Sequence, residues 1–251
     1  MPIGVERVLE ARRQFLRLGI APADARRWSL DRNTVGSLTR TRAELLPDGG
    51  LAHVRGVIDV GANVGRWSAG ILRLCRPDRL LAIEPQPSVL DALRRRIGEN
   101  PAVEIVQAAV GRETGTIDFH VTSHVDGASV LRPRTEMNEI YGVGYDVVET
   151  MPVRVVRLDD IAADLDEVTL LKIDVQGYEQ FVLEGAEQTL QRTRHVVLEV
   201  LFASHYEDDL LFADLDTLMT ARGFALVNVA PPFTHEGRAL WSDAVYSRRE
   251  V

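Results

Sequence analysis

The chain has little cysteine, little lysine and no long apolar run. Cys75 is the single cysteine among 251 residues, which excludes an intramolecular disulfide and a cysteine-rich metal site. Lys172 is the single lysine, and because every other cationic side chain is arginine, its rarity is interpreted as the codon bias of a GC-rich genome rather than a binding device. The near absence of cysteine favours a protein of the reducing cytoplasm.

Positive charge is also scarce. Asp and Glu exceed Lys and Arg by 37 to 29, and the formal net charge of −8 argues against general nucleic-acid binding, which needs an excess of exposed cations. Residues 1–15 lack the continuous apolar stretch of a signal peptide, and no later segment approaches the length of a membrane span. We therefore expect a cytoplasmic protein with no nucleic-acid partner and no transmembrane segment; no pattern predicts its oligomeric state.

Two nucleotide-binding motifs are missing as well. The strand-like run Val57–Val60 leads into a loop bounded by Gly61 and Gly65, which matches neither the G-x-G-x-x-G of dinucleotide sites nor the G-x-x-x-x-G-K-[ST] of phosphate-binding loops. The loop has no second glycine that would approach the phosphates, so a pyrophosphate is disfavoured and an uncharged or cationic nucleoside is favoured. The two glycines still allow a tight turn and a close approach of a ligand to the backbone.

The rest of the chain has a regular organisation. From residue 51 to residue 251, short apolar runs alternate with helical patterns, which predicts a single α/β domain with a mainly parallel sheet covered on both faces and an antiparallel C-terminal edge. Residues 1–50 have apolar positions near helical spacing and predict an amphipathic helical extension. An irregular insertion near residues 122–150 is typical either of a substrate-contacting lid or of an ornament of the fold.

Acidic residues stand at the ends of four expected strands: Asp59, Glu84, Asp174 and Glu199. Ligands of an open α/β sheet bind outside the carboxyl ends of the strands, so these side chains are candidates for ligand contact. Glu84 follows the first glycine of the loop at a spacing suited to accepting hydrogen bonds from both ribose hydroxyls, which is favoured over capping of the next helix. Asp174 emerges from a buried run, where a carboxylate is costly unless it is hydrogen-bonded, caps a helix or serves a ligand.

Five segments in a fixed order carry a resemblance to a known family. They are VIDVGANVG, AIEPQPSVLDAL, QAAVGRETGTIDFHV, VRVVRLDDI and, most specific, LLKIDVQGYEQFVLEGAEQTL. Together they resemble the FkbM-type S-adenosylmethionine-dependent methyltransferases, from about Val54 to near the C-terminal end. The resemblance implies a class I methyltransferase fold, which is Rossmann-like, with a seven-stranded, mostly parallel sheet and an antiparallel C-terminal hairpin. It also implies O-methylation of a hydroxyl on a sugar, a glycolipid or a polyketide-type natural product.

The same resemblance implies where S-adenosyl-L-methionine lies. The residues implied to contact it are Asp59, Gly61, Asn63 and Gly65 at the methionine part and sugar, Glu84 at the ribose hydroxyls, Pro85, Ala108 and Ala109 around the adenine, and Asp174 near the amino group or the reacting centre. Gln176 departs from the commonest family pattern, KIDVEG, in which this position is acidic. This leaves one fewer carboxylate beside Asp174.

Methyl transfer to oxygen requires that donor and acceptor be positioned and that the hydroxyl proton be removed. The candidates for the base are His124 in the insertion, His205, Asp174 and Glu199. Ser129 lies in a Gly-Ala-Ser segment that resembles one of the family, and we expect it to contact ligand or acceptor.

Three alternatives stay open. A divalent metal bound by Asp174, Glu199 and His205 would lower the pKa of the acceptor hydroxyl, although no spacing is specific to a metal site and none is favoured. A non-catalytic protein with the same fold would bind the donor without turning over an acceptor. An NAD-dependent oxidoreductase would share the strand, loop and acid arrangement, but the missing G-x-G-x-x-G disfavours it.

Overall fold

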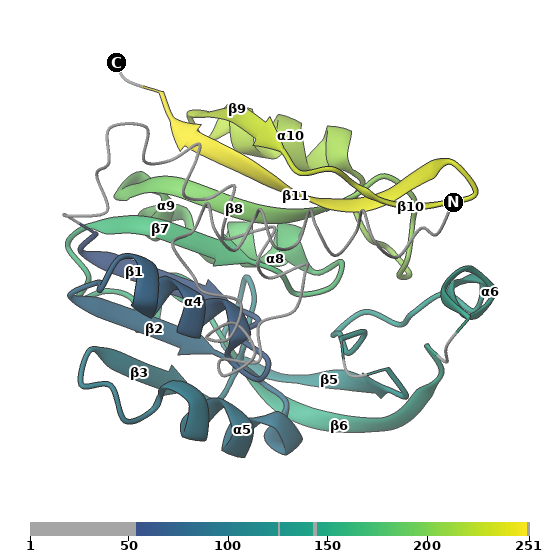
Figure 1. Ribbon diagram of the computed structural model, residues 1–251, viewed down its shortest axis with the longest axis horizontal. Coiled ribbons are helices and arrows are strands. Elements are labelled where there is room, and N and C mark those ends of the chain that lie inside the picture. Colours follow the sequence, from purple (N-terminus) through teal and green to yellow (C-terminus); the bar gives the residue numbers. More distant parts are fainter. Residues whose placement is uncertain (1–53, 125, 143–144, 250–251) are drawn as a thin grey trace, which may run out of the picture.

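A computed structural model of the chain describes residues 54–124, 126–142 and 145–249 (Figure 1). The helical extension predicted over residues 1–50 lies outside the described residues. None of the helices within the described ranges is long and apolar enough to cross a membrane.

The fold is α/β, and its main sheet has a parallel centre and an antiparallel edge. Its strand order is β10-β11-β8-β7-β1-β2-β3, and β9 pairs with the second half of β11, after the stretch that pairs with β10. The parallel strands are β1 (Gly56–Val60), β2 (Arg79–Ile83), β3 (Val103–Val106), β7 (Val168–Ile173) and β8 (Thr193–Leu201). The antiparallel strands are β9 (Phe224–Val229), β10 (Phe233–His235) and β11 (Arg238–Arg248). The predicted parallel sheet with an antiparallel C-terminal hairpin is confirmed.

The sheet differs from the expectation in the number of strands. It has eight strands in the described part of the chain, where seven were predicted, because β10 adds a short hairpin to the start of β11. Glu236 and Gly237 connect the two strands, and both have positive φ, 48° and 78°. Positive φ at both central residues is the geometry of the tight turns that match strand twist. The extra strand follows from this local turn.

Helices cover both faces of the sheet. Trp67 and Ile71 of α4 (Arg66–Leu74) and Leu93 of α5 (Pro87–Ile97) belong to one buried cluster. The opposite face buries a second cluster, to which α7 (Leu158–Ile161), α8 (Glu179–Glu184), α9 (Glu187–Gln191) and α10 (Phe212–Ala221) contribute. Burial on both faces explains the nearly continuous apolar runs of the central strands.

The sequence pattern of residues 176–191 predicts a single helix, but the structure has two helices there, α8 and α9. They are separated at Gly185, where an added Cβ would lie 2.0 Å from the carbonyl oxygen of Gly111. Only a residue without a side chain allows the two backbones to approach so closely. The close contact in the tertiary structure therefore interrupts a helical sequence pattern.

A smaller second sheet has the order β4-β6-β5. It contains β4 (Ala109–Val110), β5 (Gly115–Thr122) and β6 (Val147–Val156), and β5 and β6 are antiparallel. The predicted insertion therefore connects two strands of this sheet, and it contains the short helix α6 (Glu136–Tyr141). Figure 1 shows β5 and β6 extending away from the main sheet, with α6 beyond their far end.

Candidate active site

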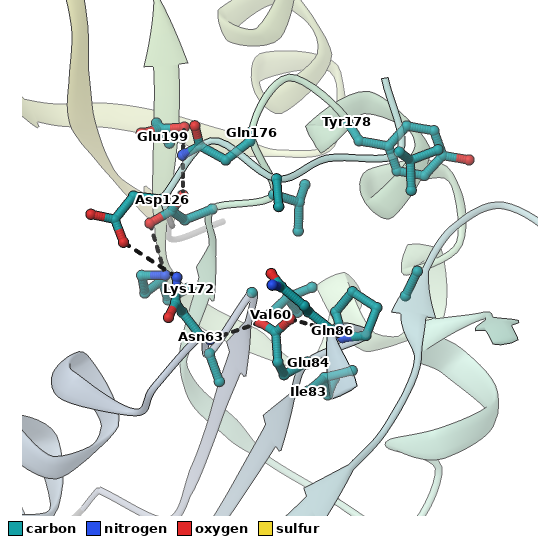
Figure 2. Close-up of a pocket in the computed structure, with 18 of the residues that line it drawn as sticks. Val60, Asn63, Ile83, Glu84, Gln86, Asp126, Lys172, Gln176, Tyr178 and Glu199 are labelled. Atoms are coloured by element: carbon teal, nitrogen blue, oxygen red, sulfur yellow. Dashed lines mark hydrogen bonds and ion pairs between the residues drawn. The ribbon is translucent and has the colours of Figure 1, made fainter. Parts of the chain in front are cut away.

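A cavity of about 480 Å³ lies at the carboxyl ends of the central strands. Most of the sequence-predicted site residues line it, namely Gly61, Asn63, Glu84, Pro85, Ala108, Ala109, His124, Asp174, Glu199 and His205. In Figure 2, Glu84 lies between Asn63 and Gln86 on one side of the cavity, and Gln176 lies beside Glu199 on the other. The parallel strands bring together residues that are far apart in the sequence because their carboxyl ends share one edge.

Glu84 is held by the two turns that flank it. Its Oε2 accepts a hydrogen bond from the backbone N–H of Asn63 (2.8 Å), and its Oε1 accepts one from the N–H of Gln86 (2.8 Å). Burial raises the pKa of Glu84 to about 7, although these two N–H groups lower it. Each carboxylate oxygen has two lone pairs, so the fixed carboxylate can still accept two hydroxyl donors.

The turn after β1 approaches β7 closely. Gly61 has a φ of 80°, and an added Cβ would lie 1.8 Å from the carbonyl oxygen of Asp174. The N–H groups of Gly61 and Ala62 both donate to the carbonyl of Ile83 at 3.0 Å. Asn63 also has positive φ, and its Oδ1 accepts from the N–H of Val64. The backbone itself therefore forms this wall of the cavity.

Two residues predicted to contact the methyl donor, Asp59 and Gly65, lie beneath the cavity instead of lining it. Asp59 is fully buried, and its Oδ2 accepts a 2.6 Å hydrogen bond from the hydroxyl of Ser68. Gly65 has a φ of 78°, and an added Cβ would lie 2.7 Å from Leu93 Cδ1. Both residues shape the loop from below, and their direct contact with a donor stays a prediction.

Lys172 lies at the centre of the site, a position that the argument from composition missed. Its Nζ lies 3.1 Å from Asp174 Oδ2 and 3.4 Å from Asp59 Oδ1, and 5.9 Å from the ring centroid of Trp67. Burial alone would lower the pKa of Lys172, but Asp174 and Asp59 raise it above its usual value. The ammonium therefore stays charged and compensates two carboxylates.

Gln176 joins two of the predicted carboxylates. Its Nε2 donates to Asp174 Oδ1 (2.9 Å) and to Glu199 Oε2 (2.8 Å), while its Oε1 accepts from the hydroxyl of Tyr206 (2.8 Å). Burial, Asp174 and other neighbouring carboxylates raise the pKa of Glu199 well above its usual value. An amide satisfies both acids here, whereas the acidic residue expected from the family pattern would add a third negative charge.

The insertion forms the other side of the cavity together with the edge of the sheet. The aromatic side chains that line this side are His124, Tyr141, Tyr145, His205, Phe233 and Trp241. The ring of Tyr141 lies 4.9 Å from that of Tyr145 and 5.4 Å from that of Phe233, and Phe233 stacks on Trp241 at 5.9 Å. We call these six side chains the aromatic wall. Of the two interpretations of the insertion, its place in the cavity lining supports substrate contact.

Two predicted residues of this side are engaged in specific contacts. His205 is buried, with Nδ1 2.6 Å from the carbonyl oxygen of Ala203 and Nε2 2.6 Å from the hydroxyl of Tyr141. Burial lowers the pKa of His205. Ser129 is also buried, and its hydroxyl donates to the carbonyl oxygen of Gln176 at 2.7 Å. It does not line the cavity but attaches the insertion to the end of β7.

Sequence reasoning missed Lys172, Tyr141, Tyr145, Phe233 and Trp241. A signal existed for Lys172, because a lysine inside the apolar run LLKIDV needs a buried partner, and period-two alternation puts residue 174 on its side. The four aromatic residues lie in the insertion and in the C-terminal hairpin. No local pattern predicts that these segments meet.

The residues considered for a metal site, Asp174, Glu199 and His205, form hydrogen bonds with other side chains. Gln176 separates Asp174 from Glu199, and His205 Nε2 faces Tyr141. Across residues 54–124, 126–142 and 145–249, no group of three or more His, Cys, Asp or Glu side chains is arranged to hold a metal ion.

Comparisons with known proteins identify the family of the chain. A sequence profile of the methyltransferase FkbM domain matches residues 59–226. The chain is 31% identical over 173 residues to the 2-O-methyltransferase NoeI of Sinorhizobium fredii, covering 64% of this chain and 70% of that protein. It is 27% identical over 194 residues to the methyltransferase sdnD of Sordaria araneosa, covering 67% of this chain and 73% of that one.

A solved structure has the same fold. The crystal structure of methyltransferase FkbM from Methylobacillus flagellatus matches with a TM-score of 0.50 at 18% identity, covering 96% of this chain and 60% of that chain. The class I methyltransferase fold predicted from the sequence is thereby confirmed. Because the profile matches more than half of the chain, the chain belongs to the FkbM family of methyltransferases.

Proposed function

We propose that this protein transfers the methyl group of S-adenosyl-L-methionine to a hydroxyl oxygen of a small molecule or glycan. The observation that carries the proposal is the extent of one cavity, which is lined at one side by Glu84 and at the other by the aromatic wall. One side has the fixed carboxylate that suits a ribose, and the other has rings and polar groups that suit an acceptor. When bound, the donor supplies an electrophilic methyl group on a sulfonium.

The donor half of the proposal uses groups fixed by the backbone. Glu84 would accept hydrogen bonds from the ribose hydroxyls while Asn63 and Gln86 hold its two oxygens. Pro85, Ala108 and Ala109 line an apolar part of the cavity that suits an adenine. Asp174, which is partly exposed and oriented by Lys172 and Gln176, would face the amino group or the sulfonium. This arrangement needs no phosphate-binding loop, in keeping with the missing glycines.

The acceptor half is proposed to take a neutral hydroxyl compound, with a sugar as the first choice. Among the charged lining residues, carboxylates outnumber cations: Glu84, Asp126, Asp174, Glu199 and Asp243 against Arg66 and Lys172. An anionic acceptor would be repelled, whereas the flat rings of the aromatic wall can pack against the C–H face of a pyranose. The similarity to a 2-O-methyltransferase supports oxygen as the acceptor atom.

The chain's contribution to the reaction is positioning and proton removal. An in-line displacement at the methyl carbon gains most of its rate from a fixed geometry of donor and acceptor. The candidates for the proton acceptor on the cavity lining are Asp174, His124, Glu199 and His205. Two of these acids are already engaged by the amide of Gln176.

Calorimetric titration tests the donor assignment against the alternatives. We expect S-adenosylmethionine and S-adenosylhomocysteine to bind and NAD not to bind, and Glu84→Gln to weaken both interactions. The substitution to Gln is preferred to Ala because Glu84 is buried and accepts two backbone hydrogen bonds. Tight NAD binding with no response to S-adenosylhomocysteine would sink the methyltransferase proposal.

Methyl transfer itself is tested with a panel of neutral methyl hexopyranosides, matched uronic acids and hydroxylated polyketides, using mass spectrometry to detect added methyl groups. We expect methylated products from neutral hydroxyl compounds. We expect little reaction with the uronic acids, because the carboxylates of the cavity would repel them. Donor binding with no product from any compound would favour the non-catalytic alternative.

A further inference from the structure

We propose that Tyr141 and His205 act as a pair that accepts the proton of the acceptor hydroxyl, with Tyr141 touching the acceptor and His205 receiving the proton through it. This inference rests on the proposed function and deepens it. It assigns to Tyr141, which the sequence did not indicate, a direct catalytic contact, and it gives His205 an indirect role in place of direct contact with the acceptor.

The hydrogen bonds of His205 fix its protonation. A carbonyl oxygen can only accept, so the 2.6 Å contact with Ala203 requires that the proton of the imidazole be on Nδ1. Burial lowers the pKa of His205, which keeps the ring neutral near pH 7. Its Nε2 therefore has a lone pair, and the hydroxyl of Tyr141 must donate to it across 2.6 Å. The pair is already aligned for transfer of that proton.

The phenolic oxygen of Tyr141 can relay a proton while the phenol stays neutral. Tyr141 lines the cavity, and a hydrogen bond from Trp241 reaches its side chain. Burial, Tyr145 and Glu199 raise the pKa of Tyr141, whereas Trp241 lowers it. An indole N–H can only donate, so it occupies one lone pair of the phenolic oxygen and leaves the other free to accept a proton. The proposal uses the second lone pair for the acceptor hydroxyl.

Backbone contacts hold the two residues together. Tyr141 is the last residue of α6, and the segment before this helix pairs with the loop that contains His205. The N–H of Arg134 donates to the carbonyl of His205 (2.8 Å), and the N–H of Glu207 donates to the carbonyl of Arg132 (2.8 Å). Asp209 fixes the same loop by accepting from the N–H of His205 at 2.7 Å. These contacts make the distance between the two rings a property of the fold rather than of one flexible side chain.

The proposed step is balanced. The acceptor oxygen forms a bond to the methyl carbon while the carbon–sulfur bond breaks. The electron pair of the carbon–sulfur bond stays on sulfur and leaves a neutral thioether. The hydroxyl proton moves to the oxygen of Tyr141 as the phenolic proton moves to Nε2 of His205, which becomes an imidazolium. Because the hydroxyl becomes far more acidic as its oxygen is alkylated, a base with a lowered pKa is sufficient. The imidazolium then returns its proton to solvent.

The competing carboxylates are less suited to this role. Asp174 is paired with Lys172 at 3.1 Å, and the amide of Gln176 donates to both Asp174 and Glu199. Burial and nearby carboxylates raise the pKa of Glu199, and its Oε2 already accepts the hydrogen bond from Gln176 at 2.8 Å. The geometry thus favours these acids for orientation and the Tyr141–His205 pair for proton transfer.

The first test needs no acceptor. Nitrogen-15 histidine spectra of the full chain, with His205 assigned by comparison with His205→Asn, report which ring nitrogen carries the proton. We expect the neutral Nδ1–H form at pH 7, with an Nε2 resonance that shifts in Tyr141→Phe. An Nε2–H form in the wild type, or an Nε2 resonance that ignores Tyr141→Phe, would overturn the pair.

The second test is kinetic and uses whichever panel compound the wild type methylates. Removing a general base usually costs at least about 100-fold in rate, so Tyr141→Phe is expected to lower kcat about 100-fold with donor affinity unchanged. Tyr246→Phe is the matched control, because Tyr246 is a buried tyrosine outside the cavity lining, and it should keep wild-type kcat. Retention of kcat by Tyr141→Phe contradicts the inference but leaves the proposed function intact; failure of the wild type to bind the donor contradicts the proposed function.

The pH profile separates a chemical role from a structural one. The wild type should lose kcat below an apparent pKa under 6.5, as His205 becomes protonated, and this acidic limb should be absent from His205→Asn. The groups that face the pair, Tyr145 and Glu199 near Tyr141 and Asp209 near His205, remain in that variant. Because the pair acts as one unit, the double variant should be no slower than either single variant; additive losses contradict the proposal.

Discussion

The two halves of the cavity are built differently. The half proposed to bind the methyl donor, the donor half, is made from strand ends, tight turns and buried charges, and its wall is largely backbone at Gly61 and Ala62. The acceptor half is made from side chains of the insertion, the loop after β8 and the C-terminal hairpin, which meet only in the folded protein. A substitution in a wall made of backbone is expected to destabilise the fold. A substitution in a wall made of side chains is expected to change ligand binding and to leave the fold intact.

A buried charge network separates the halves. Lys172 lies between Asp59 below and Asp174 above, and Gln176 continues the network from Asp174 to Glu199 and Tyr206. Removal of one member of such a network leaves another without its partner, which costs more than removal of an exposed charge. The comparison therefore predicts stability effects on the donor side and binding effects on the acceptor side.

The largest effect is expected for Gly61→Ala. The added Cβ would lie 1.8 Å from a backbone oxygen at a residue with positive φ, so the central strands must separate. We expect a loss of at least about 4 kcal/mol in the free energy of unfolding, measured by denaturant titration.

Gly237→Ala is the matched control. Gly237 has nearly the same φ, 78°, in the hairpin between β10 and β11, but no atom lies within 4 Å of an added Cβ. This substitution should lower the free energy of unfolding by only about 1 kcal/mol, the cost of a positive φ for a residue that has a side chain. Equal losses for the two variants would show that the close approach of β1 and β7 does not matter.

Lys172→Met should follow in size. It leaves Asp59, which is fully buried, without its cation, and breaking a buried pair costs about 3–5 kcal/mol. The double variant Asp59→Leu/Lys172→Met removes both charges and should recover part of that loss in the same unfolding experiment. A double variant less stable than Lys172→Met would mean that the ion pair is not the cause.

Glu84→Gln tests the donor half by binding and by proton release. Because burial raises the pKa of Glu84 to about 7, the free protein is partly protonated there near neutral pH. The ribose hydroxyls would bind the ionised form, so donor affinity should rise between pH 6 and pH 8 and binding near pH 7 should release a proton. Loss of charge-assisted hydrogen bonds should weaken donor binding about 10- to 100-fold.

Glu179→Gln controls for burial without ribose contact. Burial also raises the pKa of Glu179 to about 7, but this residue does not line the cavity. Calorimetry in buffers of different ionisation enthalpy should detect proton release in the wild type and in Glu179→Gln but not in Glu84→Gln. Proton release that persists in Glu84→Gln would contradict the ribose assignment.

Phe233→Ala should have the smallest effect, confined to the acceptor. Phe233 is 41% exposed and belongs to the aromatic wall, so its removal should raise the acceptor KM about 3- to 10-fold, as expected for one aromatic contact. Donor affinity and unfolding should stay near wild type. Leu226→Ala removes a similarly exposed side chain outside the cavity and should leave both constants unchanged. A large loss of donor affinity in Phe233→Ala would show that the two halves are not separate.

The positions of the residues in the proposed donor half were largely predictable from sequence. Glu84 and the glycine loop stand at the ends of consecutive strands, and parallel strands place such residues at one edge whatever the rest of the chain does. Errors arose where contacts over long distances prevail over local pattern, as at Gly185, which interrupts the predicted helix because it touches Gly111. Asp59 was rightly located at the strand end, but only the structure shows that it supports Lys172 from beneath.

The sequence by itself determined the alternation of strands and helices, the family and the strand ends where a donor would lie, because these depend on hydrophobic period, turn residues and short motifs. Only the tertiary structure decided the partners of Lys172, the bridge at Gln176 and the meeting of Tyr141 with His205. The physical reason is that such contacts are set by packing between segments far apart in the chain, and no local pattern specifies which side chains will face each other across a cavity.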